Sequence, residues 1–429
     1  MPQRQTSNRA ATPSEKCIAI TFLALLGTLL FWLNGAIARQ QPAGLQNQLS
    51  PAEIQAGWIL LFDGESAGPD QPLPYGWYAS GDAKWEVVAG EIRSSGAQPG
   101  FLVTTTDYGD FQLSAEFRAA ETTNSGIFLR TVAKPTSPAV DCYELNIAAP
   151  EVSPFPTGSL VQRQKSDLSH SPHGPATDDQ WHRFEVTFDK GRCTVKLDGQ
   201  QVLDYTDPRP LGRGAIALQA NTGPIAFRNL KLFPLGTEPI FNGRDLTGWT
   251  LFPGKASEYS VTSMGELQVK NGPGMLESTG KYGDFVLQWQ VQTNGDQLNS
   301  GVFFRQIPGE FTQGYECQIQ NGYKNGDRTQ PVDCGTGGFY RRQNARLVNS
   351  NDREWTAVTL VAHGPHMAAW VNGRQVSDWT DTRKPDDNPR KGLRTAAGTF
   401  SLQGHDPTTD ILFRELKVAE MLPRQAVDK

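Results

Sequence analysis

Three short stretches in the C-terminal half of this 429-residue chain could bring acid–base groups together. The stretches GVFFR, YECQIQ and FSLQGHD contain Arg305, Glu316, Gln318, Gln403 and His405. Side chains alternate between the two faces of a strand, so each stretch has one face that carries polar groups. If these faces line one side of a sheet, they could bind sugar hydroxyls and move a proton. The alternative is a solvated face with an ordinary Arg–Glu pair.

The N-terminal half repeats these stretches. NSGIFLR (124–130) returns as NSGVFFR (299–305), and Tyr108 of the first YGDF returns as Tyr282, 174 residues later. This period is too long for a solenoid repeat and fits a duplicated domain. The matching polar groups, which we expect to bind substrate, are Arg130, Glu144, Asn146, Gln219 and Asn221.

The two copies differ at one position that matters for chemistry. His405 in the second copy corresponds to Asn221 in the first. An amide can bind hydroxyl groups, but it cannot exchange protons near neutral pH as an imidazole can. The first copy is therefore predicted to be a binding or degenerate domain, and the second to be the active one.

The elements that would position these groups are strands. FQLSAEF (111–117) and FVLQWQV (285–291) alternate with a period of two, and Asp198-Gly199 and Asn372-Gly373 are typical two-residue hairpin turns. Beyond the apolar N-terminal run, only residues 50–58 suggest a short helix, with Ser50 as its cap and a proline in its first turn. Many short strands predict an all-β protein built as sandwiches or barrels.

The domain plan follows from the repeat. We expect a signal or anchor segment at 1–38, a linker at 39–55, and domains at 56–235 and 236–422. The first segment joins a basic leader to the apolar run 17–38 and ends in Ala-Ile-Ala, which is typical of a cleaved secretory signal. A retained membrane anchor is the alternative. Either indicates export, to the periplasm, the cell surface or the extracellular space.

Composition narrows the partners. The chain has 38% hydrophobic and 20% charged residues and a net charge of −5. This composition is globular and argues against nucleic acid, which favours a basic surface. Membrane contact is expected only through an uncleaved N-terminal segment. In an oxidising compartment we expect a disulfide between Cys317 and Cys334 and, less strongly, one between Cys142 and Cys193.

Further candidates lie in loops. Asp333, in PVDCGTGG, could reach the site or serve turn chemistry, and Tyr340 could line the rim of the cleft. The pairs His170/His173 and His363/His366 lie in Gly/Pro-containing segments, where a structural role outweighs a metal-binding one.

The order of motifs is also specific. Each copy runs through Phe-(Asp/Asn)-Gly, YGDF, NSG-x-Phe-x-Arg, Tyr-Glu-x-x-Ile, Thr-Gly, an Asp/Asn-Gly hairpin, and Phe-Arg-x-Leu-Lys. This order resembles the 3-keto-disaccharide hydrolase domain family, twice over nearly the whole chain after residue 56. The resemblance implies two tandem concanavalin A-like jelly rolls and exported carbohydrate chemistry.

Three functions remain open on the sequence. The first is hydrolysis of a 3-keto-glycoside by proton abstraction and elimination, with His405 or Glu316 as base, Arg305 as clamp, and Gln318 and Gln403 as hydroxyl binders. A divalent metal could join Glu316 and His405, but two ligands do not define a site. The second is a pair of binding modules without turnover. The third is a glycan hydrolase with paired carboxylates, which needs a second acid close to Glu316.

Overall fold

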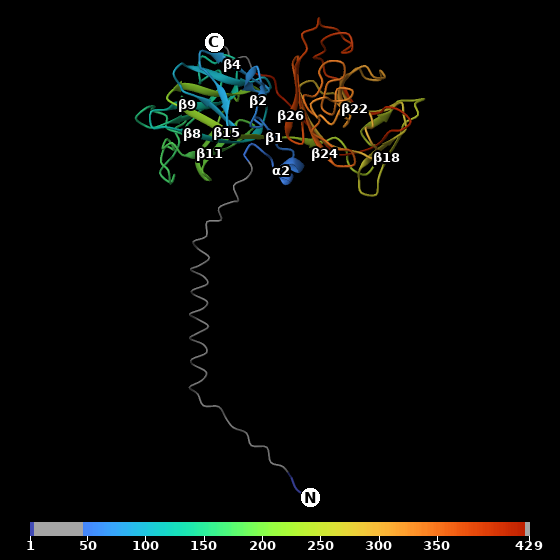
Figure 1. The fold of residues 1–429 in the computed structure, drawn as a ribbon, viewed down its shortest axis with the longest axis horizontal. Helices are drawn as coiled ribbons and strands as arrows, with labels where there is room; N and C mark the ends of the chain where they lie inside the picture. Colours follow the sequence, from blue (N-terminus) through green and yellow to red (C-terminus); the bar gives the residue numbers. More distant parts are fainter. Residues whose placement is uncertain (4–45, 425–429) are drawn as a thin grey trace. The chain divides into compact units, whose positions relative to one another are not determined.

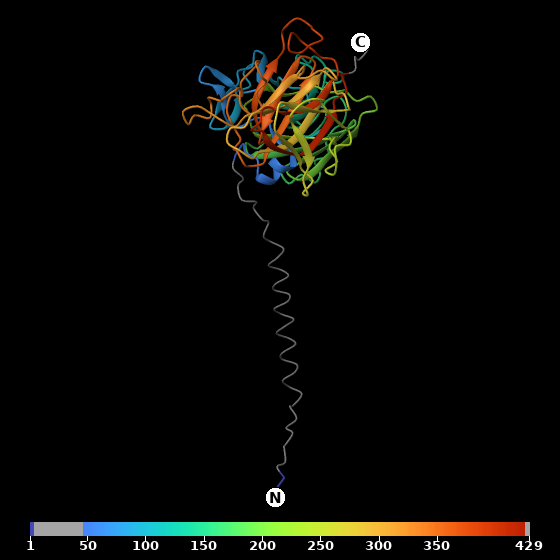
Figure 2. The same cartoon turned by 90° about the vertical axis from the view of Figure 1, so that its right-hand side faces the viewer.

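The computed structural model describes residues 1–3 and 46–424. Apart from the short helix α2 (Pro51–Ala56), the regular structure from residue 46 onward consists of β-strands. They form two sandwiches in chain order, blue to green and yellow to red in Figure 1 and seen from the side in Figure 2. The fold prediction of two tandem jelly-roll sandwiches is confirmed.

In the first sandwich, an eight-stranded sheet packs against a five-stranded sheet. The larger sheet contains β13 (Gln200–Thr206), β12 (Arg192–Leu197), β11 (Trp181–Asp189), β8 (Phe111–Ala119), β15 (Ile225–Pro234), β6 (Glu91–Ser94) and β5 (Glu86–Val88), with β1 (Ile59–Leu60) also on β15. The smaller contains β10 (Tyr143–Ala148), β9 (Asn124–Thr131), β14 (Ala215–Thr222), β7 (Gly100–Thr104) and β4 (Trp77–Gly81). A separate ribbon pairs β2 (Ser66–Gly68) with β3 (Gln71–Pro74).

The second sandwich repeats this plan. Its eight-stranded sheet contains β18 (Glu258–Val261), β19 (Leu267–Lys270), β28 (Asp410–Glu420), β21 (Phe285–Thr293), β24 (Thr356–His363), β25 (His366–Val371) and β26 (Arg374–Thr380), with β16 (Glu238–Pro239) on β28. Its five-stranded sheet contains β17 (Trp249–Leu251), β20 (Gly274–Ser278), β27 (Thr399–Gly404), β22 (Ser300–Gln306) and β23 (Tyr315–Ile319).

The core lies between the two sheets of each sandwich. Phe111, Leu113, Ala115 and Phe117 of β8 are buried in the first core, as their period of two predicts. The equivalent β21 buries Phe285, Leu287, Trp289 and Val291 in the second. The apolar side chains of each strand therefore point toward the facing sheet, and together they fill the space between the two sheets.

The local turn and cap predictions also hold. Ser50 caps α2 in a reciprocal capping box with Glu53, and Pro51 occupies the first turn. Asp198-Gly199 and Asn372-Gly373 both have positive φ, at 49° and 83° and at 48° and 77°. Such angles match a tight hairpin turn of the twist that the flanking strands need.

The two sandwiches are in direct contact. The N–H of Leu60 in β1 donates to the carbonyl of Gly373 (2.8 Å), and the Trp370 indole donates to the carbonyl of Leu60 (2.9 Å). Arg213 of the first sandwich forms an ion pair of 3.0 Å with Asp284 of the second. The segment that begins the first sandwich therefore also covers the second.

The cysteine prediction is wrong in this structure. Cys142, Cys193, Cys317 and Cys334 are all buried free thiols. Burial raises the pKa of Cys142, Cys193 and Cys334 to about 12, so the thiolate that would form a disulfide is scarce. Cys142 and Cys193 also belong to separate hydrophobic clusters.

The apolar run 17–38, predicted as signal or anchor, lies outside the described residues. Among the residues that the structure describes, no helix is both long and apolar enough to cross a membrane.

Candidate functional site in the second sandwich

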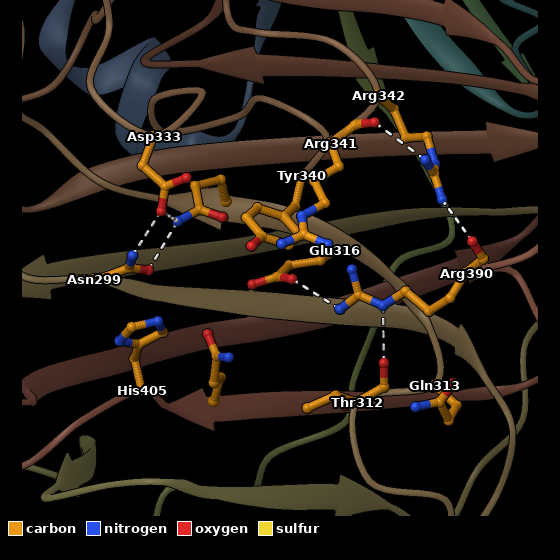
Figure 3. A pocket seen from close by; sticks show the side chains of 12 residues that line it. Asn299, Thr312, Gln313, Glu316, Asp333, Tyr340, Arg341, Arg342, Arg390 and His405 are labelled. Carbon is orange, nitrogen blue, oxygen red and sulfur yellow. Dashed lines mark hydrogen bonds and ion pairs between the residues drawn. The ribbon is translucent and has the colours of Figure 1, made fainter.

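A cavity of about 490 Å³ opens on the five-stranded sheet of the second sandwich. Figure 3 shows the side chains that line it. They come from β23, β27 and the loops around the sheet: Asn299, Thr312, Gln313, Glu316, Gln318, Asp333, Tyr340, Arg341, Arg342, Arg390, Gln403 and His405. The structure thus brings together six residues predicted from the sequence, namely Glu316, Gln318, Asp333, Tyr340, Gln403 and His405.

Glu316 occupies the interior of this cavity and is paired with a cation. Its Oε2 lies 2.9 Å from Nη2 of Arg390, whose Nε donates to the carbonyl of Thr312 (2.9 Å). Burial raises the pKa of Glu316, and the positive charge of Arg390 opposes the rise. The carboxyl group is therefore held between an acid and an anion, a state suited to proton transfer.

Gly301, on the neighbouring strand β22, lies directly against the Glu316 side chain. A Cβ on Gly301 would lie 2.8 Å from Oε1 of Glu316, closer than such atoms approach in proteins. The repeated NSG motif thereby has a structural explanation. Ser300 ties β22 to β27 through the carbonyl of Gln403 (2.6 Å), and Gly301 leaves room for the carboxylate.

Amides surround the carboxyl group. Asn299 Nδ2 donates to Asp333 Oδ2 (2.7 Å), and Gln318 Nε2 donates to Asn299 Oδ1 (2.8 Å) and more weakly to Asp333 (3.3 Å). The Oε1 atoms of Gln318 and Gln403 are buried and have no hydrogen-bond partner among the residues described. Leaving a buried amide oxygen without a hydrogen bond costs free energy, so these two oxygens can accept hydrogen bonds from the hydroxyl groups of a ligand.

His405 is far more open to solvent than Glu316. Its side chain is 43% exposed, and its Nδ1 lies 2.8 Å from Oδ2 of Asp406. The carboxylate favours the tautomer with the proton on Nδ1, which leaves Nε2 with its lone pair. Figure 3 places the imidazole on the side of the cavity opposite Tyr340 and Arg341.

Arg305 was predicted as the cation of the site, and this is wrong. Its side chain is fully buried and donates to the carbonyls of Gly283 (2.8 Å) and Gly364 (2.6 Å) and to Asp284 (3.0 Å). The cause is a bulge: Arg305 has a φ of 45°, and the register of β22 with β27 shifts after Phe303. A bulge interrupts the alternation of faces on which the prediction depended.

Arg130, its counterpart in the first sandwich, follows the same rule and corrects the same prediction. It is buried with a φ of 50°, bonds the carbonyls of Gly109 (3.0 Å) and Leu211 (2.8 Å), and forms an ion pair with Asp110. The repeated arginine therefore braces each sandwich instead of lining a site.

Arg390 is the cation that lies beside Glu316 in this cavity, and sequence reasoning missed it. Tyr315 bonds Asp381 and the N–H of Arg394, as Tyr143 bonds Asp207 and the N–H of Leu211. Asp381 and Arg394 are 13 residues apart, but Asp207 and Leu211 only 4, so the second copy has nine extra residues here. Arg390 stands in this insertion, and the length difference was the available signal.

A second insertion supplies Asp333. Thr336 donates its N–H to the carbonyl of Gln320, as Thr157 does to Ala148, but these pairs are 16 and 9 residues apart. The seven extra residues include Asp333, which reaches the cavity. Both insertions add a charge to the second site that the first sandwich lacks.

The corresponding groups of the first sandwich are more enclosed. Asn146 donates to the carbonyl of Phe155 and to Ser153, so its amide is held by the following loop. Burial raises the pKa of Glu144 to about 7, and a hydrogen bond with Gln219 opposes the rise. Gln219 keeps a buried Oε1 without a partner among residues 46–424, and Asn221 stands where His405 does. This copy retains hydrogen-bonding groups but not the imidazole.

The remaining histidine pairs lie away from the cavity. His363 Nε2 accepts the N–H of Asp107 (2.9 Å) and His366 Nε2 lies 3.1 Å from Thr106 Oγ1, so this pair joins the two sandwiches. His170 contacts Ser169, and His173 lies beside His182. Within residues 1–3 and 46–424, no group of three or more His, Cys, Asp or Glu residues is placed to hold a metal ion.

The family comparison agrees with the duplication. A family model described as a 3-keto-alpha-glucoside-1,2-lyase-like domain matches residues 57–232 and again 236–419. The chain belongs to this family. Its two copies of the 3-keto-alpha-glucoside-1,2-lyase-like domain account for both sandwiches and for the cavity in the second.

Solved structures offer more distant likenesses. A candidate glycosyl hydrolase from Parabacteroides distasonis is 20% identical, with a TM-score of 0.35, over 43% of this chain and 94% of its own. Carbohydrate binding module CBM66 from Bacillus subtilis is 15% identical, with a TM-score of 0.30, over 40% and 96%. A Bacillus licheniformis β-glucanase is 13% identical, with a TM-score of 0.27, over 37% and 92%. No curated protein matches the chain.

Proposed function

We propose that the second 3-keto-alpha-glucoside-1,2-lyase-like domain cleaves 3-keto-glycosides, including 3-keto-disaccharides, by elimination and hydration. The observation that carries the proposal is the cavity of about 490 Å³ in which an imidazole, a buried carboxyl–arginine pair and unpartnered amide oxygens converge. Its volume suits a small ligand, and its polar lining suits a sugar.

His405 is the base in this proposal. A ketone at C3 acidifies the hydrogen at C2, and Nε2 of His405 takes that proton while Asp406 holds Nδ1. The electron pair of the C2–H bond forms a C1=C2 double bond as the bond from C1 to the glycosidic oxygen breaks. Glu316 as base, the other assignment open on the sequence, leaves the imidazole to act as the acid.

Glu316 protonates the leaving oxygen, because burial raises its pKa and makes the acid form accessible. The guanidinium groups of Arg390 and Arg341, which line the cavity, stabilise the negative charge that develops on the C3 oxygen. Water then adds to the double bond: the Glu316 carboxylate takes one proton from the water as its hydroxide joins C1, and the proton on His405 returns to C2. The net reaction is hydrolysis with one water consumed.

In this scheme the side-chain oxygens of Gln318 and Gln403 accept hydrogen bonds from sugar hydroxyl groups. Asp333 and Asn299 hold the Gln318 side chain in place. Glu144, Asn146, Gln219 and Asn221 give the first domain a binding or degenerate role, since it lacks the imidazole. If both domains only bind sugars, the chain is instead a tandem binding module.

One experiment separates these readings. The purified chain is incubated with a 3-keto-disaccharide and with its unoxidised parent, with and without chelator, and released monosaccharides are measured. Release from the keto compound alone supports the proposal, and loss with chelator would add a metal to the site. Binding of both compounds without release from either would favour the binding modules.

Asp333 gives a specific reason to keep a second candidate. It places a second carboxylate in the cavity with Glu316, as hydrolysis of ordinary glycans requires. Its Oδ2, however, is engaged by Asn299 and Gln318. Release of sugar from the unoxidised parent, abolished by Asp333→Asn, would favour this second function.

We also propose that the chain is exported, since its N-terminus combines a basic leader, an apolar run and Ala-Ile-Ala. Fractionation of expressing cells, with N-terminal sequencing of the product, tests this. A new N-terminus near residue 39 outside the cytoplasm identifies a cleaved signal. An intact N-terminus in the membrane fraction identifies an anchor, and a cytoplasmic product contradicts export.

A further inference from the structure

The first sandwich contains a socket that the N-terminal segment of the same chain fills. The N–H of Asn47 donates to Oδ1 of Asn229 (2.6 Å), and the N–H of Asn229 donates to Oδ1 of Asn47 (2.8 Å). The side-chain amides of Asn47 and Gln46 both donate to the carbonyl of Gly90 (2.8 Å each). Asn47 is only 4% exposed, so this is a buried and fully paired contact.

Two glycines shape this socket. A Cβ on Gly64 would lie 3.0 Å from Nδ2 of Asn47, and a Cβ on Gly90 would lie 2.9 Å from Nε2 of Gln46. Both glycines have positive φ, and Asn229 stands at a bulge with a φ of 53°. The socket is therefore built from backbone geometry that few sequences adopt.

The second sandwich repeats the same framework. Gly243 (φ 69°), Gly265 (φ 81°) and Glu415 (φ 53°) stand where the sequence repeat places Gly64, Gly90 and Asn229. Below the bulge, Arg228 bonds Glu116 at 2.8 Å and covers the Trp181 ring at 4.0 Å. Its counterpart Arg414 bonds Gln290 at 2.8 Å and covers Trp355 at 3.8 Å.

In the second sandwich this framework surrounds a cavity of about 810 Å³, which Gly243, Gly265 and Glu415 line together with Gln55 of α2. The chain order explains why. Asn47 lies 14 residues before Leu61, whose N–H donates to the carbonyl of Leu230. Ile240 is the residue of the second copy that matches Leu61, and the position 14 residues before Ile240 falls within β15. The position that matches Asn47 is therefore part of the first sandwich and does not enter this cavity as Asn47 enters the first socket.

We propose that this cavity is a peptide socket, which binds an extended segment of another polypeptide that presents an asparagine side chain. The asparagine Oδ1 accepts the N–H of Glu415, and its Nδ2 donates to the carbonyl of Gly265, as Asn47 does at Asn229 and Gly90. The Glu415 carboxylate accepts the backbone N–H of that asparagine, the role that Oδ1 of Asn229 has in the first sandwich.

The test uses a fluorescent peptide with the sequence of residues 44–50, Gly-Leu-Gln-Asn-Gln-Leu-Ser, and the full chain. Fluorescence anisotropy should show saturable binding. Replacing the peptide asparagine with alanine should weaken binding at least about tenfold, as should Glu415→Ala in the protein, since each removes hydrogen bonds from the contact. Glu415→Asn, which restores the residue of the first socket, should retain binding.

Matched controls locate the peptide. Glu316→Gln, in the other cavity, should leave its affinity unchanged, and a photoreactive peptide should label the segment around Met264, which also lines the socket. The absence of saturable binding, equal binding of the asparagine and alanine peptides, or equal affinity of the Glu415→Ala protein would each overturn the proposal. Circular dichroism of both Glu415 variants establishes that the fold is intact.

Discussion

Nη2 of Arg390 lies 2.9 Å from Oε2 of Glu316, and the two residues come from different parts of the fold, a loop and a strand. Glu316 stands on β23, a strand that has a counterpart, β10, in the first sandwich. Arg390 stands in a loop that is nine residues longer in the second sandwich than in the first. The acid of the site thus belongs to the duplicated framework, and its cation belongs to an addition. This relationship explains how two copies of one domain can differ in chemistry.

Arg390→Ala should raise the pKa of Glu316 further, because it removes the cation that opposes the effect of burial. If protonated Glu316 is the acid, the alkaline limb of the profile of kcat/KM against pH should move to higher pH. The rate itself should fall about 10²-fold through loss of charge stabilisation. Arg390→Lys should shift the limb less. Arg192→Ala, at an exposed ion pair, is the control, and an unchanged profile in Arg390→Ala would remove Arg390 from the mechanism.

His405→Gln should reduce turnover by about 10²–10⁴-fold, the usual loss for one acid–base group. Binding of a 3-keto-disaccharide, measured by calorimetry, should stay within about tenfold, because glutamine still offers a hydrogen bond. His170→Gln, at an exposed histidine of the first sandwich, should change neither. Full activity in His405→Gln would transfer the role of base to Glu316.

Gly301→Ala should displace the Glu316 carboxylate, since the new Cβ would lie 2.8 Å from Oε1. We expect a loss of kcat of about 10–10²-fold, as small misplacements of catalytic groups produce. Gly126→Ala is the matched variant, because this glycine occupies the same strand position in the first sandwich. It should affect stability but not turnover. Equal turnover in Gly301→Ala and the parent chain would show that the carboxylate position does not matter.

Glu144 should make stability depend on pH. Its folded pKa of about 7 lies above the ordinary value of 4.5, so the folded state binds the proton more tightly. Its contribution is fully present below about pH 4.5 and is lost as pH rises through about 7, with an upper limit of about 3 kcal/mol. Urea unfolding at pH 5 and pH 8 should show a smaller fall in Glu144→Gln than in the parent chain or in the exposed control Glu151→Gln. An identical fall in all three would exclude Glu144 as the source.

Local patterns in the sequence determined the framework. The duplication, the all-β fold, the hairpins at Asp198-Gly199 and Asn372-Gly373 and the Ser50 cap all follow from short-range periodicity and turn chemistry. Glu316 and Gln318 were placed on the cavity face correctly because β23 alternates without interruption. Strand alternation is a property of neighbouring residues, so the sequence alone carries it.

Only the tertiary structure determined which charged side chains line the cavity. A positive φ at Arg305 moved that side chain into the interior, and no pattern of apolar residues reveals a bulge of this kind. Arg390 and Asp333 reach the cavity from loops, whose paths depend on distant contacts such as the bond of Tyr315 to Asp381. Loops lack a periodicity that fixes where their side chains point, so their contribution appears only once the chain is folded.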